Sequence, residues 1–140
     1  MVTADTFKRG FKNGISTLIE LSKILVPVYI GVELLDASGL LNILAEFFEP
    51  VMSIFGLPGE ASLIIILSYF LNIYAGLGAI AAIELDTVQL TTIAIMTSIA
   101  HSLITETAIA KKLGVSAAAS IVVRVFFSVL MGILYYRMFG

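Results

Sequence analysis

The sequence contains no cysteine, and only 13% of its residues are charged. The absence of cysteine excludes disulfides, thiolate metal sites and thiol catalysis. The formal net charge is −2, and no basic cluster is larger than the group formed by Lys8, Arg9 and Lys12. We therefore expect no nucleic-acid partner. Stability has to come from the packing of helices.

Apolar residues, by contrast, are abundant. They make up 59% of the 140 residues, and the mean hydropathy is +1.07, so one small soluble core could not bury them all. Residues 61–83 carry no charge, and residues 87–105 contain only a neutral His101. Each run is about long enough to cross a bilayer. The sequence predicts an all-α, multi-pass integral membrane protein surrounded by lipid, with residues 1–140 forming a single domain.

The N-terminal 14 residues lack the order of a secretory signal peptide, and we expect them to be retained. Lys8, Arg9 and Lys12 precede a first apolar stretch from Ile15 to about Leu35. Basic residues flanking a span favour the cytoplasmic side. The pattern predicts a prokaryotic cell-membrane protein with a cytoplasmic N-terminus.

Residues 40–55 carry a narrow polar stripe on an otherwise apolar helix, formed by Asn42, Glu46, Glu49 and Ser53. This segment is either an interfacial helix or a short crossing helix with its stripe turned inward. The first alternative gives four membrane helices and the second gives five. A re-entrant hairpin around residues 101–114 would change either count.

Residues 60–83 change character at Asn72. Gly76 and Gly78 weaken a helix interior, which predicts either simple close packing or a partly unwound break from Asn72 to Gly78 that lines a site. Gly78 and Ala82 also form a small-xxx-small pair typical of tight helix contacts. We expect this pair to lie at a subunit contact of a homodimer. The same is expected of a seam of small and polar residues on the last span, formed by Ser116, Ser120, Arg124, Ser128 and Gly132.

The segment from Thr91 to Gly114 carries the main functional signal. A carboxylate inside an apolar run is costly in lipid and indicates a protein interior, a partner or a water-filled cavity. On a continuous helix, Ser98 would share one polar face with several of the residues that follow it. The candidate solute- or ion-binding residues are His101, Ser102, Thr105, Glu106 and Thr107, together with Asn72.

The last span runs from Ser116 to about Tyr136 and contains Arg124. A single Arg inside a span needs a partner or water, so we expect it to pair with Glu106 or Glu20. Arg124 is thus the predicted structural charge partner.

Catalysis is not expected. His101 and Glu106 are five residues apart, which is about 140° around a continuous helix, so they do not form an acid and base pair on one face. No GxSxG or HExxH motif occurs. The single histidine has no second His or Cys at ligand spacing, so we predict no metal site and no cofactor.

The stretches GLPGEASLIIILSYFLNIYAGLGAIAAI and HSLITETAIAKKLG, followed by an apolar helix, resemble the nucleoside recognition (Gate) family of membrane proteins. That family includes the spore-maturation membrane proteins A and B and the gates of bacterial ferrous-iron transporters. The Thr105-Glu106-Thr107 turn is also similar to the re-entrant hairpin of concentrative nucleoside transporters. The resemblance implies a broken-helix core in which Thr105 and Glu106 match solute-facing positions, and Asn72 does so approximately.

Two functions from different classes follow. The leading one is a transporter or channel-like subunit for a small polar solute or ion, working as a homodimer around Glu106. The alternative is a membrane scaffold or assembly factor whose polar residues pair with one another and move nothing. A transport site should be hydrated, whereas a structural network should be dry and fully paired.

Overall fold

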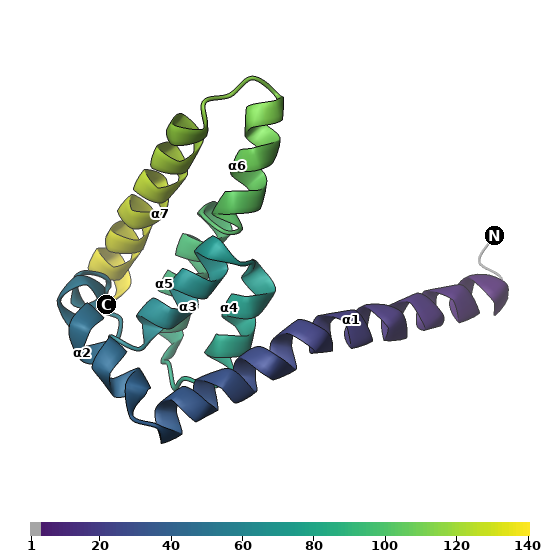
Figure 1. Cartoon of the computed structure of the whole chain (residues 1–140), viewed down its shortest axis with the longest axis horizontal. Helices are drawn as coiled ribbons and strands as arrows, with labels where there is room; N and C mark the ends of the chain where they lie inside the picture. Colours follow the sequence, from purple (N-terminus) through teal and green to yellow (C-terminus); the bar gives the residue numbers. More distant parts are fainter. Residues whose placement is uncertain (1–3) are drawn as a thin grey trace.

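The computed structural model describes residues 4–140, and within that range the regular secondary structure is entirely helical. The all-α prediction is confirmed (Figure 1). The elements are α1 (Ala4–Ala37), α2 (Leu40–Met52), the short 3-10 turn η1 (Ser53–Phe55), α3 (Ala61–Phe70), α4 (Ile73–Ile80), α5 (Thr87–Ile99), α6 (Leu103–Lys112) and α7 (Ala117–Phe139).

Some of these helices are the two halves of a longer apolar helix that is interrupted by a break. α5 and α6 together form a span of 26 residues, Thr87–Lys112, and α7 forms one of 23 residues. By length and composition, these two of the described helices could cross a membrane, or three if the bent pair α1 and α2 counts as one span. α3 and α4 are shorter apolar helices separated at Leu71 and Asn72. The broken membrane helices expected from the sequence are therefore present.

The segment predicted as an interfacial or crossing helix forms α2 and η1, which turn by 90° from α1. Its polar stripe has a local use, because Glu49 Oε2 accepts a hydrogen bond of 2.8 Å from the backbone N–H of Gly59. This bond ties α2 to the turn before α3. Beyond the contacts of its C-terminal half with α2 and α4, α1 extends away from the other helices (Figure 1).

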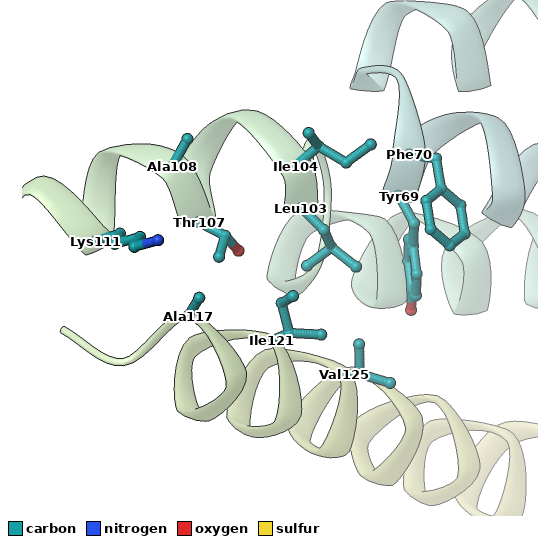
Figure 2. Close-up of a pocket in the computed structure, with 10 residues that line it drawn as sticks. All are labelled: Tyr69, Phe70, Leu103, Ile104, Thr107, Ala108, Lys111, Ala117, Ile121 and Val125. Carbon is teal, nitrogen blue, oxygen red and sulfur yellow. The ribbon is translucent and has the colours of Figure 1, made fainter.

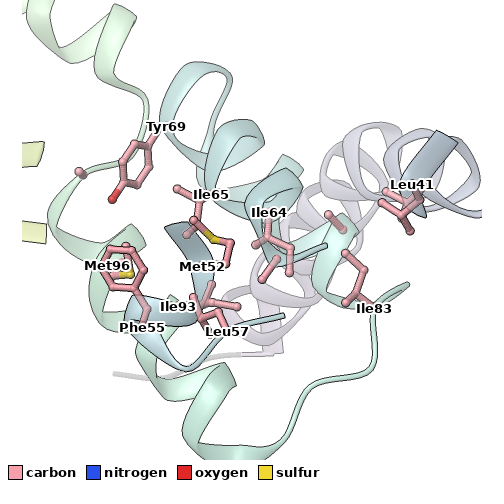
Figure 3. Packing of buried hydrophobic residues seen from close by; sticks show 14 of the residues in the cluster. Leu41, Met52, Phe55, Leu57, Ile64, Ile65, Tyr69, Ile83, Ile93 and Met96 are labelled. Atoms are coloured by element: carbon pink, nitrogen blue, oxygen red, sulfur yellow. The ribbon is translucent and has the colours of Figure 1, made fainter. Parts of the chain in front are cut away.

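The core is small and lies around α3 and α5 (Figure 3). Ala61, Ile64, Ile93 and Met96 are almost completely buried there. Large apolar side chains such as Phe126 lie exposed on α7. A soluble protein of this size would bury such residues, whereas in a bilayer they face lipid at little cost.

Small residues allow close helix contacts within the chain. A Cβ atom added at Gly78 would lie 3.0 Å from the carbonyl oxygen of Leu25 and 3.0 Å from Cβ of Val28, both on α1. A Cβ atom added at Gly132 would lie 2.7 Å from Sδ of Met96 on α5. Gly78 and the seam of α7 were predicted as subunit contacts. Gly78 and Gly132 pack inside one chain, Gly78 against α1 and Gly132 against Met96 of α5.

Candidate functional site

The span formed by α5 and α6 is interrupted near its middle. α5 ends at Ile99, α6 begins at Leu103, and Ser102 adopts a left-handed conformation with φ 47°. The sequence predicted one continuous polar face from Ser98 to Glu106. That prediction is wrong, because the break at residues 100–102 rotates the two halves out of a common helical register.

The break frees backbone groups that must find other partners inside a membrane. The carbonyl of Thr97 lies 3.0 Å from Nδ1 of His101, and the carbonyl of Ile99 accepts a hydrogen bond of 3.1 Å from Nε of Arg124 on α7. The backbone N–H of Ser102 donates to the carbonyl of Ser68, at 2.9 Å. Ser68 lies near the end of α3, so this bond joins the two helix breaks.

Glu106 lies between two basic side chains. Its Oε2 is 2.5 Å from Nη1 of Arg124, and its Oε1 is 3.1 Å from Nε2 of His101. The ion pair expected for Arg124 is therefore made with Glu106 rather than with Glu20. The separation of about 140° between His101 and Glu106 applied to an unbroken helix; the break brings the two side chains together.

The ionic cluster, formed by His101, Glu106 and Arg124, makes its ion pairs while its side chains stay partly exposed. The side chains are 29%, 40% and 21% exposed, respectively. Seven residues separate Arg124 from the start of α7 at Ala117, which corresponds to a depth of roughly 10 Å along the helix. The cluster therefore lies inside the span while keeping one open edge.

Each ring nitrogen of His101 has an oxygen atom as its neighbour. Both ring nitrogens face acceptors, the carbonyl of Thr97 and the carboxyl group of Glu106. A neutral imidazole donates through only one nitrogen. Both contacts are satisfied when the ring carries two protons or when Glu106 is itself protonated.

The other predicted site residues do not join this cluster. Asn72 caps α4, because its Oδ1 accepts a hydrogen bond of 3.0 Å from the N–H of Ala75. Only Leu71 and Asn72 are unwound there, so the predicted break is shorter than residues 72–78. Thr105 is exposed. Thr107 is buried and lines a separate cavity.

Sequence patterns did not predict one polar network. Tyr69 and Ser128 share a hydrogen bond between their hydroxyl groups, and Ser128 Oγ donates to the carbonyl of Met96 at 2.8 Å. Since Ser128 has one hydroxyl hydrogen, Tyr69 is the donor to Ser128. The four-residue spacing of Ser128 from Arg124 was a signal, whereas nothing in the sequence pointed to Tyr69.

No group of three His, Cys, Asp or Glu side chains within residues 4–140 is arranged to hold a metal ion. The broken spans, the exposed apolar surface and the ionic cluster inside a span define an α-helical integral membrane protein with a polar site at a helix break. Such breaks occur in membrane proteins where backbone lines a protein interior or a cavity.

Comparison with known families assigns this membrane protein more narrowly. The family model described as nucleoside recognition, Gate, matches residues 18–117. The chain belongs to this family, which confirms the resemblance seen in the sequence. It is also 34% identical over 119 residues to the uncharacterized membrane protein YvoD of Bacillus subtilis (strain 168). The match covers 85% of this chain and 38% of that relative. No solved structure matched the chain.

Proposed function

We propose that this protein is a subunit of a membrane transporter or channel-like unit for a small polar solute or ion. The observation that carries the proposal is Glu106, held between Arg124 and His101 at a helix break inside a membrane span. Ionisable groups inside spans are costly and commonly mark paths for solutes, ions or protons. In this function Glu106 coordinates a cation or proton, or accepts hydrogen bonds from a solute.

The open edge of the ionic cluster supports this use. Glu106 is 40% exposed although it makes two ionic contacts. A carboxylate with such an edge is unfavourable against lipid, so the edge faces water or a second protein surface. We propose that two copies form a homodimer around this site. The chain spans 38% of the length of the relative that it matches.

The proposed location is the cell membrane, with a cytoplasmic N-terminus. The basic side chains of Lys8, Arg9 and Lys12 are exposed on the first turns of α1. Basic residues beside a span favour retention on the cytoplasmic side.

The second candidate function is a scaffold or assembly factor. The pairing of the ionic cluster favours it, because His101, Glu106 and Arg124 satisfy one another and two carbonyls freed by the break. A cluster serving only this role would hold the helices together and would not bind a solute.

Flux measurements in liposomes distinguish the two functions. Purified protein is reconstituted, and the uptake of labelled uridine, of Na⁺ and of protons is measured under imposed gradients. Transport predicts flux of at least one probe in the parent, and Glu106→Gln should abolish that flux. Glu46→Gln, which changes an exposed acid on α2, is the matched control and should retain it.

Two outcomes oppose the transport function. Flux that persists in Glu106→Gln removes the proposed role of this residue. Absence of flux for every probe, with a folded parent protein, favours the scaffold. Subunit counting in lipid nanodiscs tests the homodimer separately, and a single copy in an active preparation would contradict it.

A further inference from the structure

An apolar cavity of about 560 Å³ opens between α3, α6 and α7. This volume is in the range of about 300–1,000 Å³ found for small-molecule sites. Leu103, Ile121 and Val125 form much of its wall (Figure 2). An apolar wall of this kind suits a hydrocarbon chain rather than a polar solute.

One polar group inside the cavity has no partner. Thr107 is 8% exposed and lines the cavity, and its Oγ1 makes no hydrogen bond within residues 4–140. A buried hydroxyl without a partner costs roughly 1–3 kcal/mol. A pure hydrocarbon would leave this cost in place. An occupant with an ester or phosphate oxygen beside its apolar chain satisfies this hydroxyl once the Thr107 side chain rotates toward the cavity.

A positive charge stands at one end of the same cavity. Lys111 lines it near Ala117 (Figure 2), and no ion pair within residues 4–140 involves Lys111. The spans Thr87–Lys112 and Ala117–Phe139 end and begin beside it, so Lys111 lies where headgroups meet the hydrocarbon region. A ligand there has its anionic group at Lys111 and its chain along α6 and α7.

We propose that this cavity binds an anionic phospholipid, with one acyl chain between α6 and α7 and the headgroup phosphate at Lys111. Thr107 donates to an ester oxygen of the same lipid. The site is separate from the ionic cluster of His101, Glu106 and Arg124, and it does not depend on transport. The bound chain fills the space between α6 and α7.

The test uses the purified chain in detergent, titrated with dioleoylphosphatidylglycerol or dioleoylphosphatidylcholine, with the bound fraction read by native mass spectrometry. The parent should bind the anionic lipid more tightly. Lys111→Gln should weaken that binding by about fivefold, the effect of one basic residue near an anionic lipid surface. The matched control is Lys112→Gln, which removes the same charge one residue away and outside the cavity lining.

Two further variants test the cavity itself. Ala117→Phe places a large side chain in the lining and should abolish retention of both lipids. Thr107→Val removes the hydroxyl without changing the shape and should weaken both lipids while the protein stays folded. Glycerol phosphate, which has the headgroup charge without a chain, should not bind.

Three results would overturn the proposal. Equal effects of Lys111→Gln and Lys112→Gln would indicate attraction to surface charge alone. Unchanged lipid retention in both Ala117→Phe and Thr107→Val would place the lipid elsewhere. A shift from dimer to monomer in Ala117→Phe, with lipid retention unchanged, would show that a second copy occupies the cavity.

Discussion

The two helix breaks differ in where their freed backbone groups find partners. At the break between α3 and α4, the N–H groups of Leu71 and Asn72 both donate to the carbonyl of Leu67, and the side chain of Asn72 caps α4. In each of these bonds the partners lie within five residues of one another, and the link to the other break is the hydrogen bond from the N–H of Ser102 to the carbonyl of Ser68. At the break between α5 and α6, the partners include Arg124 from α7 and Ser68 from α3.

This difference separates a structural break from a candidate functional one. A break that is satisfied locally can form wherever the sequence permits it, and it needs no charge. At the second break, Arg124 donates to a freed carbonyl. A lone guanidinium inside a span requires a counter-charge, and Glu106 supplies it. The second break is therefore the one that combines a charged pair with freed backbone groups.

The largest expected effect comes from neutralising the charged pair at the second break. Glu106→Gln should destabilise the protein by roughly 3 kcal/mol, the low end of the range for a broken buried pair, because the pair is partly exposed. Arg124→Gln should cost less, since Glu106 keeps its contact with His101. The double variant should recover much of the loss. Thermal unfolding in detergent measures all three.

Glu46→Gln serves as the control for that series, because it removes an exposed acid on α2, which is part of neither break. If the single variants of Glu106 and Arg124 unfold at the same temperature as this control, the charged pair does not stabilise the second break. The two breaks would then not differ in this respect. Additive losses in the double variant would also contradict a direct pair.

A smaller effect is expected at the first break. Asn72→Ala removes the cap of α4 and should cost about 1 kcal/mol, while Asn72→Asp keeps an acceptor and should cost less. Any flux measured for the parent should persist in both, because Asn72 makes no hydrogen bond to the ionic cluster within residues 4–140. Loss of flux in the stably folded Asn72→Asp variant would instead give the first break a functional role.

The smallest effect concerns backbone conformation at the second break. Ser102 is left-handed, which costs an L-residue about 1–2 kcal/mol, and glycine relieves that cost while losing about 0.5–1 kcal/mol of entropy. Ser102→Gly should therefore raise the free energy of unfolding slightly. Ser98→Gly, the same change on the helical α5, should lower it. Chemical denaturation of the two variants compares them directly, and a loss in both would mean that the left-handed turn is not strained.

The sequence predicted much of the fold because its signals are local. Long uncharged runs identify membrane helices, and the all-α class that they predict is the one that the structure has. The need of Arg124 for an acid also follows from composition, since the cost of an unpaired charge in lipid does not depend on the details of the fold.

The amino-acid sequence by itself therefore determined the all-α membrane class, the family and the requirement for a counter-charge to Arg124. Only the tertiary structure decided that α5 stops at Ile99, that His101 meets Glu106, and that Gly78 packs on α1. Helical periodicity assumes an unbroken helix, and it places residues correctly only up to the first break. The position of that break depends on donors from α7 and acceptors from α3, which lie far away in the chain and reach it only after the helices have packed.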